Sequence, residues 1–312
     1  MNENAKPSVQ FKTVSDQHEG QRIDNYLMRE LKGLPKSKIY SLLRQGQIRI
    51  DGKRAKPDSR VEPGQVIRIP PLRLDESAPP PAPSKQLSNL LADRILFEDK
   101  GLIVINKPSG IAVHGGSGIN LGLIEALRAI RPEEKSLELV HRLDKETSGL
   151  LMVAKKRSVL KALHDQLRNG EMHKSYFALL AGTWRGKTHR IEAPLLKLLA
   201  ANGERFVRVD RDGKESRTDF VCLKNFKQAT FVEAILYTGR THQIRVHSQF
   251  AGHPVIGDEK YGEEATNKYF RSQGMGRLFL HSAKLEIEYN GKRQQFEAPL
   301  DKELAEFLAK LE

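Results

Sequence analysis

The sequence turns from polar to apolar within HRLDKETSGLLMVA, the stretch that runs from His141 to Ala154. Its second part, from Gly149 onwards, has the length and the apolar bulk of a strand that is buried on both faces. Its first part is dense in charged and polar residues, so we expect it to form a loop that leads into this strand. The stretch therefore predicts a polar loop beside a fully buried strand, and the chain is organised around this unit.

The predicted loop carries a carboxylate, Asp144, between two cations, Arg142 and Lys145. Adjacent positive charge favours the ionised form of a carboxylate, which can then act as a nucleophile or a base. The alternative is a turn aspartate whose side chain accepts hydrogen bonds from nearby backbone amides. These residues by themselves are compatible with both interpretations.

Four segments of the chain resemble, in the same order, the signature motifs of the RluA-type pseudouridine synthases. They are HRLDKETSGLLMVAKK from His141, KSYFALLAG at Lys174–Gly182, GRTHQIRVH at Gly239–His247 and LFLHSAKL at Leu278–Leu285. Together they span nearly the whole of the C-terminal domain predicted below. Two shorter segments, Gly203–Val209 and Gly213–Ser216, resemble a member of that family that acts on the large ribosomal subunit.

The resemblance implies that the chain isomerises specific uridines to pseudouridine in large-subunit (23S) ribosomal RNA, with Asp144 as the catalytic nucleophile. It implies that Arg245 pairs with Asp144, and a planar guanidinium would suit both carboxylate oxygens. It also implies that Tyr176 stacks on the target uracil, near enough to take part in proton transfer, while Leu280 forms the opposite, apolar wall. The remaining residues expected to bind the substrate are His141, Arg142 and Arg240.

Each of these positions also has a simpler interpretation. An arginine on a helix usually lies at the surface, a tyrosine that opens a strand is normally a core residue with a hydrated hydroxyl, and Leu280 suits an ordinary core.

The chain as a whole has two competing interpretations, a non-catalytic S4-domain RNA-binding or ribosome-assembly factor and an RNA methyltransferase. The intact set of Asp144, Tyr176 and Arg245 argues against the first. The second would need a dinucleotide-like glycine loop after a parallel strand, and none is evident.

Length and composition limit the class of protein. A chain of 312 residues is longer than one ordinary domain and can bury a large core beside a smaller module. Its single cysteine, Cys222, excludes a disulfide framework and favours a reducing compartment. No apolar run approaches the ~18 residues that span a bilayer, and the N-terminus is polar rather than signal-like. We therefore expect a cytoplasmic protein without a membrane partner.

The positive charge is concentrated near the N-terminus. The chain has a formal net charge of +13 and a pI near 9.7, which points to a polyanionic partner. Residues 20–70 contain twelve Lys or Arg and five Asp or Glu, a difference of +7. More than half of the net charge thus lies in about a sixth of the chain, which favours a dedicated basic module.

This basic segment has the pattern of two short helices followed by a small hairpin, with a turn at Asp51-Gly52 and a further strand at Val66–Ile69. The arrangement resembles an S4 RNA-binding domain. The cations expected to contact RNA phosphates, without reading sequence, are Lys36, Lys38, Arg44, Arg49, Lys53 and Arg54. The alternative is a hydrated basic face with no ligand, and the density of charge favours RNA binding.

The histidines of the C-terminal half, His242, His247, His253 and His281, raise the question of a metal site. None forms a His-x-x-x-His pair, and no thiolate cluster accompanies them. We therefore expect no metal and no cofactor. Capping of backbone groups or contact with phosphate is the favoured role, and the chain is expected to act as a monomer.

The predicted elements indicate an α+β fold, because strands cluster around a few helices without regular alternation. We expect a flexible N-terminus at 1–19, an S4-like RNA-binding domain at 20–72 and a proline-rich linker at 73–90. A pseudouridine synthase catalytic domain should follow at 91–312, with a mainly antiparallel, mixed sheet and flanking helices.

Within the catalytic domain, Thr241 is the predicted N-cap of a helix that carries Arg245 and ends before Gly252. Residues 195–205 have no predicted role. The other predicted strands and helices lie at 102–105, 121–130, 158–168, 176–181, 206–209, 218–222, 231–236 and 304–311.

Overall fold

The computed structural model divides the chain into two compact units, Met1–Pro81 and Ala82–Glu312. Its described residues are 8–31, 33–72, 82–115, 121–134, 136–199 and 205–311. Among them, no helix has the length and apolar character needed to cross a membrane.

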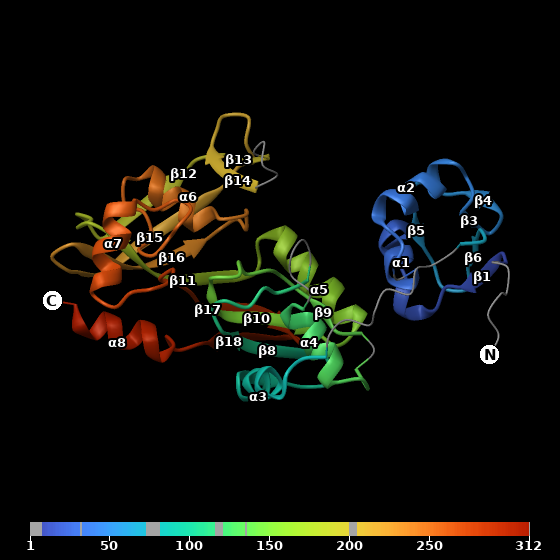
Figure 1. Cartoon of the computed structure of the whole chain (residues 1–312), viewed down its shortest axis with the longest axis horizontal. Helices are drawn as coiled ribbons and strands as arrows, with labels where there is room; N and C mark the ends of the chain where they lie inside the picture. The colour runs from blue at the N-terminus through green and yellow to red at the C-terminus, as the bar shows by residue number, and fades with distance from the viewer. Residues whose placement is uncertain are drawn as a thin grey trace. The chain divides into compact units, whose positions relative to one another are not determined.

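The N-terminal unit combines two helices with a small sheet (Figure 1). Its elements are β1 (Gln10–Thr13), η1 (Asp16–His18), β2 (Gln21–Arg22), α1 (Ile23–Glu30), α2 (Lys36–Arg44), β3 (Arg49–Ile50), β4 (Lys53–Arg54), β5 (Arg60–Val61) and β6 (Val66–Ile69). The main sheet has the order β1-β6-β3-β4, and β2 pairs with β5. Ile23, Leu27 and Ile39 of the helices share one core with Ile67 of β6. The helices are confirmed, because the helical spacing of their apolar residues matches the face they bury.

The hairpin predicted at Asp51-Gly52 is confirmed. β3 and β4 pair antiparallel with Ile50 opposite Lys53, so only these two residues form the connection. The φ angle is 47° at Asp51 and 76° at Gly52, as a type I′ turn requires. Glycine enters this region without a steric penalty from a Cβ atom, and aspartate tolerates it.

The flexible N-terminus predicted at 1–19 is wrong for the residues that the structure describes. β1 pairs antiparallel with β6, and the 3-10 turn η1 follows it. Val14, between them, is 2% exposed and belongs to the core of the unit. A four-residue strand with little burial of its own carries too weak a pattern for recognition without its partner strand. Residues 1–7 lie outside the described residues.

The C-terminal unit is built on a ten-stranded sheet. Its strands are β7 (Ile95–Glu98), β8 (Leu102–Lys107), β9 (Glu138–Leu139), β10 (Ser148–Ala154), β11 (His173–Ala181), β12 (Thr188–Glu192), β15 (Arg217–Asn225), β16 (Ala229–Leu236), β17 (Leu280–Tyr289) and β18 (Lys292–Glu297). The main path is β12-β15-β16-β11-β17-β10-β8-β7, with β18 beside β17 and β9 beside β10. The pairing of β10 with β17 is parallel, and the other pairings are antiparallel. The α+β class and the mainly antiparallel mixed sheet are therefore confirmed.

The helices of this unit are α3 (Lys85–Asp93), α4 (Leu123–Ile130), α5 (Arg157–Asn169), α6 (Gln243–Phe250), α7 (Glu264–Ser272) and α8 (Lys302–Lys310). α5 packs against β10 and β17, whereas α6 packs against β15. The central strand β10 is buried along its whole length, as its uninterrupted apolar sequence predicts.

The last part of the predicted linker 73–90 is helical rather than extended, because α3 begins at Lys85. Ser84 caps this helix, and its Oγ accepts a hydrogen bond from the Leu87 N–H at 3.1 Å. Leu91 is fully buried in the core of the C-terminal unit, and Leu87 packs against that core. Because several prolines precede Ser84, the sequence pattern assigns the first turns of this helix to the spacer. Residues 73–81 lie outside the described residues.

Residues 195–199, which had no predicted element, form β13 (Leu195–Leu199), paired antiparallel with β14 (Arg205–Val209). Leu195 and Val207 of this hairpin share a small core with Val246 of α6 and with Tyr261. Because α6 carries Arg245, the hairpin braces a helix of the candidate site. β14 belongs to the segment Gly203–Val209, which resembled the large-subunit enzymes. The first two residues of that segment, Gly203 and Glu204, lie outside the described residues.

Gly149 allows β10 and β17 to approach closely, and Gly149→Ala should be strongly destabilising. Its φ is +104°, and an added Cβ would lie 2.2 Å from the carbonyl oxygen of Ser282. We expect a loss of about 2–4 kcal/mol and a fall in Tm of roughly 5–15 °C, measured by thermal unfolding. Gly291→Ala is the control, because φ there is +70° but nothing lies within 4 Å of the added Cβ. Equal shifts in the two variants would contradict the close approach.

Candidate active site

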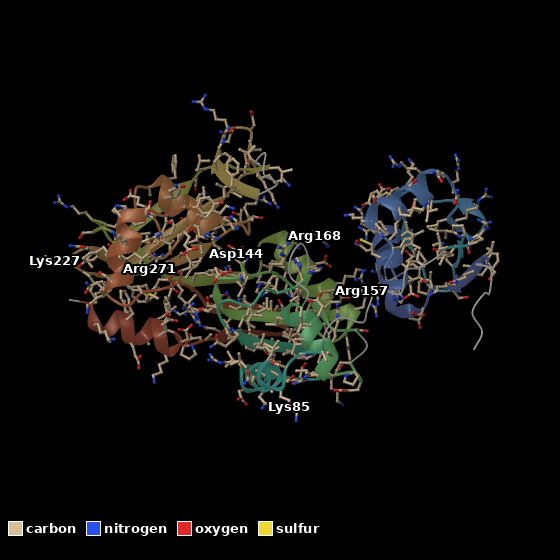
Figure 2. The ribbon with its side chains drawn as sticks, in the orientation of Figure 1. Lys85, Asp144, Arg157, Arg168, Lys227 and Arg271 are labelled. Carbon is tan, nitrogen blue, oxygen red and sulfur yellow. The ribbon has the colours of Figure 1, made fainter. Side chains whose placement is uncertain are left out.

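A pocket of about 820 Å³ lies in the C-terminal unit. The residues predicted to be catalytic or to bind substrate in this domain all line it: His141, Arg142, Asp144, Tyr176, Arg240, Arg245 and Leu280. Figure 2 shows Asp144 near the middle of the sheet, in the region where Figure 1 labels β11. The fold thus brings together four motifs that are far apart in the sequence, while the catalytic roles of the residues stay predictions.

The order of the strands explains this convergence. β17 lies between β10 and β11, and its first residues pair with both, since Ser282 is opposite Gly149 on one side and Tyr176 on the other. The loop that carries Asp144 leads into β10, so it ends beside β17 and close to Tyr176. The parallel pairing of β10 with β17 therefore brings the Asp144 loop and the middle of β11 together at one site.

Arg245 contacts Asp144 with one nitrogen, which corrects the prediction of a two-pronged pair. Its Nη1 donates to Asp144 Oδ2 at 3.2 Å. The two-pronged pair is made instead with Asp258, because Nε donates to Oδ2 at 2.7 Å and Nη2 to Oδ1 at 2.8 Å. Asp144 Oδ1 accepts no hydrogen bond from any residue that the structure describes. One oxygen of the candidate nucleophile is therefore held by Arg245, and the other carries no hydrogen bond within the described residues.

Asp258 fixes the orientation of Arg245, and sequence reasoning missed it. Its side chain is completely buried, and Oδ1 also accepts from the backbone N–H groups of Lys260 and Tyr261, each at 3.0 Å. Its hydrogen bond raises the pKa of Arg245, although burial opposes this. The only signal was an aspartate in the glycine-flanked segment GDEKYG, a composition that equally suits a surface turn.

His242 is a second neighbour of Asp144. Its Nε2 lies 3.7 Å from Asp144 Oδ2, and its Nδ1 is 2.7 Å from the Tyr261 hydroxyl. That hydroxyl also accepts the Val207 N–H at 3.0 Å, and a neutral imidazole can either donate to it or accept from it through Nδ1. Burial lowers the pKa of His242, against the opposing effect of Asp144, which favours this neutral imidazole near pH 7.

His242 also replaces the predicted Thr241 at the start of α6. It occupies the N-cap position with φ 55° and ψ 21°, and no side chain caps the helix. The sequence offered threonine as the better capping residue, but here the N-cap residue is a histidine whose side chain contacts Tyr261. The predicted end of the helix is confirmed, because Gly252 follows the C-cap residue Ala251 with φ +81°.

Tyr176 and Leu280 form neighbouring walls of the pocket. Tyr176 pairs with Ser282 and Ala178 with Leu280 across β11 and β17, so the two side chains lie on the same face of the sheet as diagonal neighbours. Tyr176 is 7% exposed, and burial, with a smaller effect of Asp144, raises its pKa to about 12. Its hydroxyl therefore keeps its proton at neutral pH.

The loop after Asp144 is braced by residues 107–110. Lys107 Nζ and the Gly110 N–H both donate to the Lys145 carbonyl, at 3.1 and 2.9 Å, and Ser109 Oγ donates to the Glu146 carbonyl at 2.7 Å. Lys107 is fully buried, and its other bonds go to the carbonyls of residues 108 and 111. Burial lowers the pKa of Lys107 to about 7, while three carbonyl acceptors match the three N–H donors of the ammonium form.

The other histidines considered for a metal site are engaged with the protein. His247 is hydrogen-bonded to Thr218 Oγ1 and the Ala193 carbonyl, and His281 to Ser148 Oγ. His141 lines the pocket, but its Nε2 accepts the Met152 N–H, and burial lowers its pKa to about 3. No group of three or more His, Cys, Asp or Glu side chains suited to a metal occurs within the described ranges.

The six cations predicted to bind RNA in the N-terminal unit are all exposed. They lie on α2 and the β3–β4 hairpin and are Lys36, Lys38, Arg44, Arg49, Lys53 and Arg54. Their role in RNA binding stays a prediction.

Comparison with known proteins identifies both units. The family described as RNA pseudouridylate synthase matches residues 101–250, and the S4 domain family matches residues 21–67. The chain is 50% identical over 308 residues to "Ribosomal large subunit pseudouridine synthase C" of Haemophilus influenzae, covering 97% of this chain and 95% of the relative. It is 49% identical over 310 residues to the protein of the same name from Escherichia coli, covering 98% and 97%.

Solved structures show the same relationship. "Human RNA Pseudouridylate Synthase Domain Containing 4" matches with a TM-score of 0.60 and 26% identity over 73% of this chain and 97% of that one. "Human RNA Pseudouridylate Synthase Domain Containing 1" matches with a TM-score of 0.56 and 27% identity over 66% and 82%. The likeness thus extends from sequence to three-dimensional structure.

Proposed function

Because this chain belongs to the RNA pseudouridylate synthase family, we propose that it converts specific uridines of large-subunit (23S) ribosomal RNA to pseudouridine. The observation that carries the proposal is the geometry at Asp144, whose Oδ2 is held by Arg245 and which lines one pocket with Tyr176 and Leu280. The similarity to enzymes named for the large ribosomal subunit, along nearly their whole length, supports the substrate class.

The reaction is an isomerisation, so the atoms of substrate and product are the same. The bond between uracil N1 and ribose C1′ breaks, the base turns, and C5 bonds to C1′; C5 loses a proton and N1 gains one. We propose that Asp144 assists the cleavage, either by bonding to C1′ or by removing the C2′ proton. Arg245 holds the carboxylate through a hydrogen bond to Oδ2, while His242 places its Nε2 on the same side.

The detached uracil must remain in place between cleavage and rejoining. We propose that Tyr176 stacks on its ring and that Leu280 supports it, in a wall that excludes water. Stacking is worth ~1–3 kcal/mol per base, which offsets the few kcal/mol needed to unstack a uridine. The Tyr176 hydroxyl, protonated at neutral pH because burial raises its pKa to about 12, is available as a proton donor.

The exposed cations of the N-terminal unit are proposed to bind RNA phosphates and so increase affinity without reading sequence. The lining of the catalytic pocket comes from one chain, and we propose that a monomer is sufficient for activity. A single cysteine and a ribosomal substrate are consistent with a cytoplasmic location.

The decisive experiment has two parts. Pseudouridines are mapped in ribosomal RNA from cells with and without the gene, which identifies the target uridines. The purified protein is then given C5-tritiated RNA that contains such a uridine, and release of tritium is measured. Loss of specific pseudouridines and release of label in vitro are expected. RNA binding without release of label would favour the alternative of a non-catalytic ribosome-assembly factor.

Removal of residues 1–81 should weaken RNA binding and reduce its dependence on salt. The truncated chain keeps Ser84, which caps α3, so the catalytic unit should fold with an unchanged Tm. With the whole +7 charge of residues 20–70 no longer present, the slope of log Kd against log salt should fall by several units if six or more phosphate contacts are lost. Titrations at four salt concentrations measure this, and equal slopes for the full and truncated chains would rule out the N-terminal unit as an RNA anchor.

A further inference from the structure

Lys174 lies in the pocket but has no role in the geometry described so far. It occupies β11 two residues before Tyr176, and side chains two apart on a strand share a face. It is opposite Leu236 on the neighbouring strand β16, and Lys174, Tyr176 and Leu236 all line the pocket. The backbone of Lys174 therefore lies about 7 Å along the strand from that of Tyr176, and its side chain reaches into the same pocket.

This ammonium group has no partner. Among the residues that the structure describes, none forms a hydrogen bond or ion pair with Lys174 Nζ, and burial lowers the pKa of Lys174. Fully buried Lys107, by contrast, donates to three carbonyls, and half-buried Arg277 pairs with Asp301. A largely buried charge without a partner is costly, which is expected where an absent ligand supplies the opposite charge.

The surroundings of Lys174 favour an anion. Its Nζ lies against the turn that follows β16, because a Cβ added to Gly239 would be 3.4 Å from it. The other basic residues of the lining, apart from Arg245 and the histidines, are Arg142, Arg168 and Arg240. Among the lining residues described, Asp144 is the only carboxylate, and it is paired with Arg245. Figure 2 labels Arg168 on α5 and Asp144, two members of this lining.

We propose that Lys174 binds a backbone phosphate of the RNA directly adjacent to the uridine being isomerised. The inference rests on the proposed function, since it requires a nucleotide in the pocket. A nucleotide whose base lies on Tyr176 extends its phosphate along the same face of β11, where Lys174 stands. A pocket of about 820 Å³ is near the upper end of the range for ligand sites and accommodates more than a base. Lys174 thus holds the sugar-phosphate backbone while the base is detached.

This role predicts that Lys174→Met weakens RNA binding without lowering stability. The variant removes an unpartnered buried charge and keeps the apolar stem, so Tm should stay the same or rise. RNA binding should weaken about 10-fold, because a charge-assisted contact is lost. Lys302→Met is the control, since that lysine lies on α8 with a side chain that is 86% exposed, and it should change neither property measurably.

The test is a thermodynamic cycle that combines the Lys174→Met protein with RNA in which one phosphate has been made neutral. An RNA fragment with a mapped target uridine is made with a methylphosphonate in place of the phosphate on its 5′ side or on its 3′ side. One of these replacements should weaken binding to the wild type and to Lys302→Met about 10-fold, and weaken binding to Lys174→Met less than about 2-fold. Lys174→Arg should restore the preference for the charged phosphate.

Three outcomes would overturn the proposal: no effect of either methylphosphonate on the wild type, the same effect on the wild type and Lys174→Met, or a clear fall in the Tm of Lys174→Met. The affinities are measured without turnover. Failure of the proposed function would appear separately, as absence of tritium release from the unmodified RNA by the wild type.

Discussion

Asp144→Asn should reduce pseudouridine formation by at least about 1000-fold, because the amide can neither attack C1′ nor remove a proton from C2′. Affinity for RNA should remain within a few-fold of wild type, since phosphate contacts elsewhere supply most of the binding free energy. Stability should change little, because the Asp144 side chain is 31% exposed and makes one hydrogen bond to Arg245. Tritium release from C5-labelled RNA and a binding titration measure the two effects on one preparation.

Glu146→Gln is the matched control for this variant. It makes the same chemical change two residues later, at a side chain that is 50% exposed and that pairs with Lys145. The brace from Ser109 contacts its backbone carbonyl, which the substitution keeps. This variant should retain activity within about 2-fold. Tritium release by Asp144→Asn at a rate near that of Glu146→Gln would show that Asp144 is not the nucleophile.

Arg245→Met should reduce both activity and stability, and the second effect follows from Asp258. The Asp258 side chain is completely buried, and without the guanidinium its donors among the described residues are backbone N–H groups. Loss of one partner of a buried ion pair costs about 3–5 kcal/mol, or roughly 6–20 °C in Tm for a unit of this size. Activity should fall at least about 100-fold, because Asp144 loses its only arginine contact among the described residues.

Arg245→Lys and a double variant separate these effects. Lysine keeps the charge but cannot bridge both oxygens of Asp258 and also reach Asp144, so activity should still fall substantially. In Arg245→Met/Asp258→Asn the buried charge is removed while the amide oxygen still accepts from the backbone N–H groups. This double variant should recover part of the lost Tm but none of the activity. Single-turnover rates near wild type for both single variants would show that Arg245 does not act on Asp144.

Local sequence was sufficient for much of the fold. The helical spacing in α1 and α2, the Asp51-Gly52 turn and the apolar run of β10 depend on residues that are close together in the chain. Backbone preferences and the alternation of apolar residues act over a few residues, so they can be recognised without knowledge of neighbours in space. The wrong predictions concern segments whose structure is not determined by residues close together in the chain. β1 forms a strand by pairing with β6, and α3 begins directly after a proline-rich segment.

The candidate site shows the same division. The resemblance of four motifs located Asp144, Tyr176 and Arg245, and the pocket contains all three. It did not reveal that Asp258 takes the two-pronged contact of Arg245 or that Lys174 lacks a partner.

The sequence by itself determined many of the elements, the α+β class and the residue types that carry the chemistry. Only the tertiary structure decided how the charges are paired. Arg245 and Asp144 are 101 positions apart, and their contact depends on the parallel pairing of β10 with β17 and on the conformation of His242 at the start of α6. Partners of buried charges are selected by distance and orientation in three dimensions, and these are set by long-range packing that leaves no periodic trace in the sequence.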